Sequence, residues 1–123
     1  MIDHRQDVAR KGERIAAEYL EQKGWRILER NFRYGKAGEI DLIARDDEYT
    51  VFVEVKTRMS DACGAAAYAV TPGKQRQLLR LARGYMYVQG VGELLCRFDV
   101  VTVEFKRGAP VINHIHNAFT SST

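Results

Sequence analysis

The chain has 123 residues, which is enough for one domain with a buried core and too few for two. Hydrophobic residues make up 46% and charged residues 28%, the balance of a globular protein, and the formal net charge is +3. No run approaches the roughly 20 apolar residues of a membrane span, and the N-terminus lacks the apolar core of a secretory signal. We therefore expect a cytoplasmic protein with no membrane partner. Cys63 and Cys96 form no CxxC pair, so neither a disulfide framework nor a zinc site is predicted.

The charges are distributed unevenly along the chain. Residues 39–56 carry six acidic and two basic side chains, whereas residues 57–90 carry one acidic and five basic ones. Residues 1–38 carry six acidic and nine basic side chains. An acidic segment between basic ones suits a polyanionic substrate, because lysine and arginine hold phosphates while the acids hold a metal ion. The alternative is that most of these charges belong to solvated helix faces.

The first predicted element is a helix from Asp7 to Lys23, with Gly24 as the residue past its C-terminus. An apolar stripe recurs at intervals of three and four residues and comprises Ala9, Gly12, Ala16, Ala17 and Leu20. Glu13 shares this face, and a carboxylate on the packed side of a helix needs a partner because burying it unpaired is costly. Glu13 is therefore either a functional acid or a marginal residue that pairs with Arg10 or Arg14.

A strand and a basic loop follow the helix. Residues 25–32 are predicted to form the strand, since Trp25 and Ile27 alternate with polar neighbours. In the loop, residues 33–38, two glycines and Lys36 could wrap a phosphate. No GxxxxGK[ST] pattern is present, however, and an ordinary turn is the alternative.

Two strands with charged residues are predicted next, at residues 38–44 and 51–56. Both alternate with a period of two, so each is expected to have one apolar and one mixed face. The apolar face of the first strand is assigned to Ile40, Leu42 and Ala44.

Acidic residues of this hairpin are expected to lie close together. With residues 46–49 as the connection, pairing of Ala44 with Val51 places Asp41 opposite Glu54, and a two-residue loop is expected to make them diagonal neighbours. In either case Asp41, Glu54 and Lys56 share one side of the sheet. Two carboxylates beside an ammonium group can bind a hard divalent cation through oxygen and hold a water molecule next to it.

The second predicted helix begins at Thr71-Pro72, with threonine as the cap and proline in the first turn, and extends to about Val88. Residues 59–69 before it have no clear period and are expected to form a loop or short irregular helix. The buried stripe of the helix is assigned to Leu78, Leu81, Ala82, Tyr85 and Val88. Its polar surface carries Lys74, Gln75, Arg76, Arg80 and Arg83. Such a helix surface is commonly just solvated, but no acid balances these groups between residues 72 and 92, so attraction to a phosphate backbone is a hypothesis to test.

Two more strands are predicted, at residues 95–103 and 110–115, joined by a turn at residues 106–109. A strand, a crossover helix and a further strand normally give a parallel connection. His114 and His116 could face the same way, and an ordinary surface or capping role is expected for them. We predict a single domain over residues 1–119 and a disordered tail over residues 120–123.

The motif Ile40-Asp41, followed after a short interval by Glu54-Val55-Lys56, resembles the PD-(D/E)XK nuclease superfamily. More widely, the chain resembles the YraN-like family of bacterial proteins within that superfamily. The resemblance spans nearly the full chain and is carried by Gly12-Glu13, Gly24-Trp25, Arg30-Asn31, Gly38–Ala44, Phe52–Arg58, Arg97–Val100 and Asn117–Phe119. It implies an α/β fold with a restriction-endonuclease-like αβββαβ core, a mixed central sheet flanked by helices, and here an extra C-terminal strand.

The resemblance also implies the roles of individual residues. Asp41, Glu54 and the Val55 carbonyl would hold Mg2+ or Mn2+, and Lys56 would orient or help deprotonate the attacking water. In the related archaeal Holliday-junction resolvases a glutamate on the first helix joins the site, and Glu13 matches it. The residue before Asp41 is isoleucine where the superfamily motif has proline, and Glu39 is an additional acid without an assigned role. Contacts to the nucleic-acid backbone are assigned to Lys36, Arg58, Lys74, Arg76 and Arg80.

These roles imply a Mg2+- or Mn2+-dependent endodeoxyribonuclease acting on branched or repair-intermediate DNA, with DNA favoured over RNA. The alternative is a non-catalytic nucleic-acid-binding or assembly module that retains the nuclease fold. A third possibility is a structural α/β domain with a charged sheet face. Retention of Asp41, Glu54 and Lys56 at this spacing favours the enzyme. The related resolvases act as dimers, so a homodimer is compatible with the resemblance, although no segment of the sequence marks a dimer surface.

Overall fold

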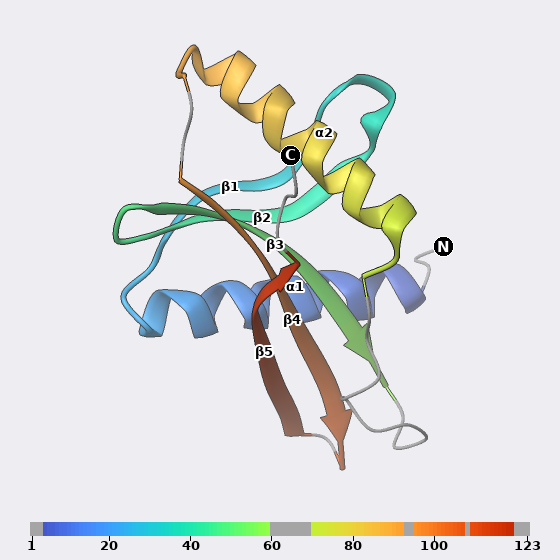
Figure 1. Cartoon of the computed structure of the whole chain (residues 1–123). Coiled ribbons are helices and arrows are strands. Elements are labelled where there is room, and N and C mark those ends of the chain that lie inside the picture. The colour runs from blue at the N-terminus through green and yellow to red at the C-terminus, as the bar shows by residue number, and fades with distance from the viewer. Residues whose placement is uncertain (1–3, 60–69, 93–94, 108, 120–123) are drawn as a thin grey trace.

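The structure is a computed structural model that describes residues 4–59, 70–92, 95–107 and 109–119. It is a mixed α/β protein whose elements follow the order predicted for an αβββαβ core with one additional strand (Figure 1). In chain order the elements are helix α1 (His4–Gln22), strand β1 (Arg26–Arg33), the 3-10 helix η1 (Gly35–Ala37), strands β2 (Glu39–Asp46) and β3 (Tyr49–Arg58), helix α2 (Pro72–Gln89), and strands β4 (Cys96–Lys106) and β5 (Ala109–Phe119).

A five-stranded mixed sheet forms the centre of the molecule, with strand order β1-β2-β3-β4-β5. Strands β1, β2 and β3 form an antiparallel meander. Strand β4 pairs parallel with β3, and β5 pairs antiparallel with β4. Helix α2 is the crossover between the two parallel strands, which confirms the connection predicted for this segment. Helix α1 lies on one side of the sheet and α2 on the other (Figure 1).

Each helix is held to the sheet by its own apolar cluster. On the α1 side, Ala16, Ala17 and Leu20 pack with Val53 and Val101. On the α2 side the cluster includes Leu78, Leu81, Tyr85, Phe52 and Phe98. Burying a side chain of the size of leucine or phenylalanine stabilises the fold by about 1.5–3 kcal/mol. The predicted stripe of α1 is thus confirmed at Ala16, Ala17 and Leu20, whereas Ala9 is exposed.

The β2–β3 hairpin has the predicted pairing of Ala44 with Val51. Its turn consists only of Asp47 and Glu48, because Asp46 and Tyr49 pair with each other. The expectation that a two-residue loop would shift the register was therefore wrong. When Asp46 and Tyr49 leave the four-residue loop and pair with each other, Ala44 still pairs with Val51.

The single apolar face predicted for β2 was also wrong. Leu42 and Ala44 belong to the cluster on the α1 side, but Ile40 belongs to the cluster on the α2 side. The alternation breaks at Asp41, where the pairing of β2 with β3 ends after Leu42 and Val53. The neighbouring strand is irregular at the same level, because Asn31 of β1 has a positive φ of 52°.

The helix ends differ in detail from the predicted ones. Helix α1 begins at His4 instead of Asp7. In α2, the Thr71 side chain accepts a hydrogen bond from the Lys74 N–H, and Gly90 ends the helix with a φ of 67°, as the capping signals predicted. Val88, assigned to the buried stripe, is instead 57% exposed, because the cluster on that face ends with Tyr85 and the half-buried Met86.

Some predictions concern residues that the structure does not describe. The predicted loop at residues 59–69 lies, beyond Met59, outside the described residues, as do Cys63 and the predicted tail at residues 120–123. No helix in the described ranges combines the length and the apolar composition that a membrane crossing requires.

Candidate functional site

Asp41 is held at the point where β2 separates from β3. Its Oδ2 atom accepts a hydrogen bond of 2.7 Å from the Val55 N–H. The last paired residues of the two strands are Leu42 and Val53, so the Asp41 carboxylate satisfies a backbone donor that the ladder leaves free. The motif residues Asp41 and Val55 are therefore in direct contact, as expected if the two strands form one site.

Three acids from three elements converge at this point: Glu13 of α1, Asp41 of β2 and Glu54 of β3. Burial raises the pKa of Asp41 to about 8, and hydrogen bonding to Glu54 together with the negative charges of Glu54 and Glu13 adds to the effect. Burial also raises the pKa of Glu13, reinforced by the charges of Glu39 and Glu54. Carboxylates that repel one another in a partly desolvated site favour either a proton or a bound cation.

Glu13 reaches the cluster because α1 approaches β3 unusually closely. Gly12, the preceding residue, lies against Thr57 of β3, and a Cβ atom at position 12 would overlap the Oγ1 and Cγ2 atoms of Thr57. Only glycine permits this approach without a shift of the helix. The Gly12-Glu13 pair thus combines a close helix–strand contact with a carboxylate directed at the site.

Asn31 is a site residue for which the sequence predicted no role. With its amide oriented to donate, Asn31 Nδ2 lies 3.0 Å from Glu13 Oε1 and 3.2 Å from Glu39 Oε1. The other oxygen of Glu39 lies 2.9 Å from Arg33 Nε. Asn31 and Arg33 therefore orient two acids at the margin of the cluster, which gives Glu39 a structural explanation. The available sequence signal was an asparagine within a strand, where this residue is uncommon.

Lys74 of α2 lies inside the acidic site rather than on the surface expected to face a phosphate backbone. Its Nζ atom is 2.8 Å from Glu54 Oε2, and the Glu54 side chain is only 12% exposed. The contact is an ion pair without directional hydrogen-bond geometry, since Glu54 Oε2 has no hydrogen-bond partner among the described residues. Lys74 therefore compensates the negative charge of Glu54.

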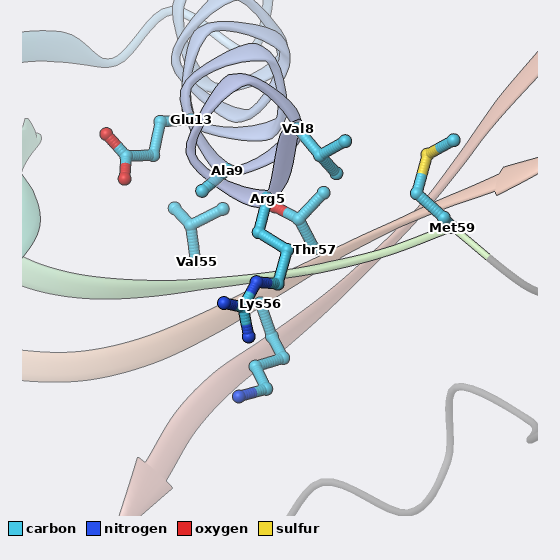
Figure 2. Close-up of a pocket in the computed structure, with 8 residues that line it drawn as sticks. All are labelled: Arg5, Val8, Ala9, Glu13, Val55, Lys56, Thr57 and Met59. Carbon is cyan, nitrogen blue, oxygen red and sulfur yellow. The ribbon is translucent and has the colours of Figure 1, made fainter. Parts of the chain in front are cut away.

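Lys56 lies next to the cluster on β3. Figure 2 shows Val55 and Thr57 directed toward α1, whereas Lys56 extends from the opposite side of the strand. These residues and Glu13 line a pocket of about 580 Å³ between the N-terminal half of α1 and β3. Lys56 is an exposed residue of β3.

Comparison with known proteins gives a match to the uncharacterised protein family UPF0102 over residues 12–103. The chain belongs to this family. The UPF0102 protein of Geobacter metallireducens is 46% identical over 116 residues, covering 94% of each chain. UPF0102 proteins of Geobacter sulfurreducens and Chlorobium chlorochromatii are each 44% identical, and the matches cover 94% and 92% of this chain and 91% of each relative.

Among solved structures, SfsA of Pyrococcus furiosus in complex with Ca2+ gives a TM-score of 0.33 at 14% identity, covering 94% of this chain and 64% of that chain. UPF0102 is the YraN-like family, and it belongs to the PD-(D/E)XK superfamily.

The donor set of the acidic site fits a hard divalent cation. Asp41, Glu54 and Glu13 supply carboxylate oxygens, and the Val55 carbonyl is the backbone oxygen next to them. Mg2+ and Mn2+ prefer such all-oxygen sets. Burial and the neighbouring acids raise the pKa of Asp41, and a bound cation would offset the repulsion among these carboxylates.

The other residues predicted to contact nucleic acid are spread over the α2 side of the molecule. Lys36 and Arg80 line one groove between η1 and α2. Arg76 is exposed on α2, and Arg58 ends β3, where it pairs with Glu104 in the register of the parallel strands. Of the five basic residues, Lys74 alone has an ion pair with one of the three site acids within the described ranges.

A second group that could hold a metal ion consists of Asp99, His114 and His116, whose ligand atoms lie within 4.8 Å of one another. The Asp99 side chain is fully buried and accepts hydrogen bonds from Arg97 Nε at 3.0 Å, Arg97 Nη2 at 3.1 Å and the Asn117 N–H at 2.9 Å. His114 Nε2 lies 2.8 Å from Asp99 Oδ2. Burial alone would raise the pKa of Asp99, but hydrogen bonds from His114, Arg97 and Asn117 outweigh it and lower that pKa.

This second group is better explained as a network that joins β4, β5 and α1. Lys23 Nζ lies 3.2 Å from His114 Nδ1, and Arg97 donates a hydrogen bond to the Asp99 carboxylate. The positive charges next to Asp99 and His114 are therefore already supplied by two side chains of the protein. His114 has a side chain only 3% exposed and packs edge-on against Trp25. The surface role expected for the histidines therefore fits His116, which is 52% exposed, but not His114.

Proposed function

We propose that the protein is a metal-dependent endonuclease-like enzyme that hydrolyses phosphodiester bonds in nucleic acid. The observation that carries the proposal is the convergence of Glu13, Asp41 and Glu54, with Asp41 anchored on the Val55 N–H and Lys56 two residues after Glu54 on β3. A buried carboxylate with a pKa of about 8 is costly to maintain in a purely structural role. Membership of a PD-(D/E)XK family supports the proposal, since Asp41, Glu54 and Lys56 resemble the motif of that superfamily.

In the proposed reaction the oxygen of a water molecule bonds to phosphorus and releases a proton to solvent, while one P–O ester bond breaks and the departing oxygen takes up a proton from solvent. A bound Mg2+ or Mn2+ supplies positive charge for the phosphate oxygens and the leaving oxygen. Asp41, Glu54 and the Val55 carbonyl would hold the cation, and Glu13 would complete a second cation position or orient water. Lys56 would position the attacking water and assist its deprotonation.

Branched or single-stranded repair intermediates are the substrates we favour, with DNA preferred over RNA. Lys36, Arg58, Arg76 and Arg80 would contact the phosphate backbone and read its shape rather than its sequence. Lys74 would leave Glu54 when the cation binds and then become available to a phosphate. A cytoplasmic location belongs to the same proposal, because cellular DNA is found there, and a homodimer is retained from the resemblance to the resolvases.

The experiment is a cleavage assay on single-stranded, duplex, flap and four-way-junction DNA with Mg2+ or Mn2+. We expect metal-dependent cutting by the wild type that is lost in Asp41→Asn and in Lys56→Ala, with circular dichroism showing both variants folded. Arg14→Gln, on the exposed face of α1, is the matched control and should retain activity. Equal cutting by the wild type and both site variants would show that a contaminating nuclease causes the cleavage, and it would refute the proposal that this protein is an enzyme.

The second candidate function is a nucleic-acid-binding or assembly module without turnover. The Lys74–Glu54 ion pair favours it, since the ammonium group of Lys74 already neutralises a carboxylate that a metal-dependent enzyme would use to bind its cation. This module would bind the same DNA panel without metal and would show no cleavage with any divalent cation. Metal-dependent cutting that requires Asp41 would exclude it.

A further inference from the structure

A groove separate from the acidic cluster lies between η1 and helix α2. It has a volume of about 670 Å³, and its walls include Tyr34, Lys36, Arg80, Arg83, Gly84 and Tyr87. In Figure 1 the β1–β2 connection is seen to rise beside α2. The residues that α2 contributes are Arg80, Arg83, Gly84 and Tyr87. They are spaced at intervals of three and four, so they form one continuous face of the helix.

The wall opposite α2 is held in place by specific contacts. The Gln77 side chain of α2 donates a 2.9 Å hydrogen bond to the Ala37 carbonyl. Gly84 allows the Tyr34 ring to lie directly on the helix, since a Cβ atom at position 84 would collide with that ring. The groove is therefore formed by the fold itself and does not depend on a bound molecule.

Its charge is uncompensated. Lys36, Arg80 and Arg83 are all exposed, and none of them has an ion pair with a carboxylate in the described part of the chain. No acidic residue occurs between Pro72 and Gln89. Three cations around one open groove favour an anionic occupant, and each can bind a separate phosphate.

Aromatic rings stand beside these cations. Tyr87 is 78% exposed and Tyr34 is 36% exposed, although both have large apolar surfaces. An amphipathic ring that projects into a basic groove is the arrangement on which single-stranded nucleic acids stack their bases. A duplex would hide its base faces, and an acidic peptide would leave the rings without a flat partner.

We propose that this groove binds a single-stranded segment of nucleic acid, with bases stacked on Tyr87 and Tyr34 and phosphates held by Lys36, Arg80 and Arg83. The inference rests on the proposed function for the identity of the polymer and adds that the substrate has a single-stranded arm. At a rise of about 1.5 Å per residue, Arg80 to Tyr87 lie roughly 9–20 Å along α2 from Lys74. Lys74 contacts the acidic site, so the arm would extend a few nucleotides from it.

The test is fluorescence anisotropy with a labelled 12-nucleotide DNA or RNA strand, a duplex of the same length and an abasic strand, all in EDTA so that no cleavage occurs. Tyr87→Ala should weaken single-strand binding about 5- to 150-fold and duplex binding less than about twofold, since stacking contributes about 1–3 kcal/mol per base. Tyr87→Phe should bind like the wild type. Tyr87 is exposed, so its substitution should leave the melting temperature unchanged.

Charge is tested separately from stacking. Arg80→Gln with Arg83→Gln should reduce the slope of log affinity against log salt by about 1.4 for single strands, whereas Arg14→Gln should not change it. An abasic strand that binds as tightly as the normal one, or a polyglutamate peptide that competes equally well, would overturn the stacking proposal. Groove variants that bind single strands like the wild type would overturn it as well.

The outcomes also separate this inference from the proposed function. Asp41→Asn should bind single strands as the wild type does, because position 41 lies outside the groove. Metal-dependent cleavage with no groove-dependent binding would leave the nuclease standing and refute the groove. Groove-dependent binding with no cleavage under any metal would support the groove and refute the nuclease.

Discussion

Asp41 accepts a hydrogen bond of 2.7 Å from the Val55 N–H, and this contact joins β2 to β3 just beyond their last paired residues. The anchor brings the carboxylate into contact with Glu54 and within the electrostatic reach of Glu13. At that position the three acids repel one another, so the stability of the site should depend on pH and on a bound metal ion.

Asp41 should make the metal-free protein less stable as the pH rises. Its folded pKa of about 8 lies above the ordinary value of 3.8, so the folded state holds a proton that the unfolded state releases. The stabilising effect of that proton is complete below about pH 4 and is lost as the pH rises through 8, with a slope of at most about 1.4 kcal/mol per pH unit. Asp41→Asn should flatten this dependence in urea titrations with EDTA. Parallel curves for both proteins would contradict the assignment.

Gly12→Ala should destabilise the protein by about 1–3 kcal/mol, because the added methyl group collides with Thr57 and pushes α1 away from β3. The same shift should reduce any metal-dependent activity through Glu13. Thr57→Ala removes two of the colliding atoms, so the double variant should regain part of the stability. A double-mutant cycle by chemical denaturation measures this coupling, and fully additive effects would argue against the contact.

Asn31→Gly should lower metal affinity or activity by about 10- to 100-fold, because the amide that orients Glu13 and Glu39 is lost. Glycine keeps the positive φ of this position, so stability should change little. Asn31→Ala loses the amide and also strains the backbone, and it should lower both activity and stability. If the glycine variant matched the wild type in Mn2+ titration calorimetry, the orienting role would be wrong.

Lys74→Gln should increase the apparent affinity for Mn2+, because it removes the ammonium group that lies 2.8 Å from Glu54 Oε2. Arg76→Gln, on the exposed surface of the same helix, is the matched control and should leave affinity unchanged. Isothermal titration calorimetry with each variant measures the difference. Weaker binding in the Lys74 variant would mean that Lys74 supports the cation site and does not compete for it.

Asp99→Asn should destabilise the protein by roughly 3 kcal/mol or more near neutral pH, since Arg97 would be left beside a buried neutral amide. The folded pKa of Asp99 is lowered, so its contribution is complete above the unfolded value near 3.8 and is lost as the pH falls through the folded pKa. The difference between the two proteins should therefore shrink in acid. Thermal unfolding at several pH values tests this, and loss of Mg2+-dependent cleavage in a folded variant would point instead to a functional metal.

Periodic patterns predicted the elements that depend on local structure. A period of two located β2 and β3, and caps at Thr71 and Gly90 located α2. Asp41, Glu54 and Lys56 could be named because alternating residues on paired strands have fixed neighbours. Ile40 and Val88 were misplaced for the same reason, since a strict period continues through a break in strand pairing and past the end of a core.

Contacts between distant residues could not be predicted in the same way. The Lys74–Glu54 ion pair, the amide of Asn31 beside Glu13, and the Asp99–His114 contact each join separate elements. Their geometry depends on how closely the helices approach the sheet, which no local period encodes. Polar residues of these types also occur on many solvated surfaces, so the sequence carried at most a weak signal for them, such as the asparagine at position 31 within a strand.

By itself the sequence determined the class of fold, the hairpin register and the acidic residues available for a site, because backbone hydrogen bonding and apolar burial act over short, regular intervals. Only the tertiary structure decided how these acids are used. Close packing at Gly12 directs Glu13 toward Asp41, the break in the β2–β3 ladder turns Asp41 to Val55, and the position of α2 sets Lys74 against Glu54. Charges interact over a few ångströms, so their effect depends on that packing and not on their order along the chain.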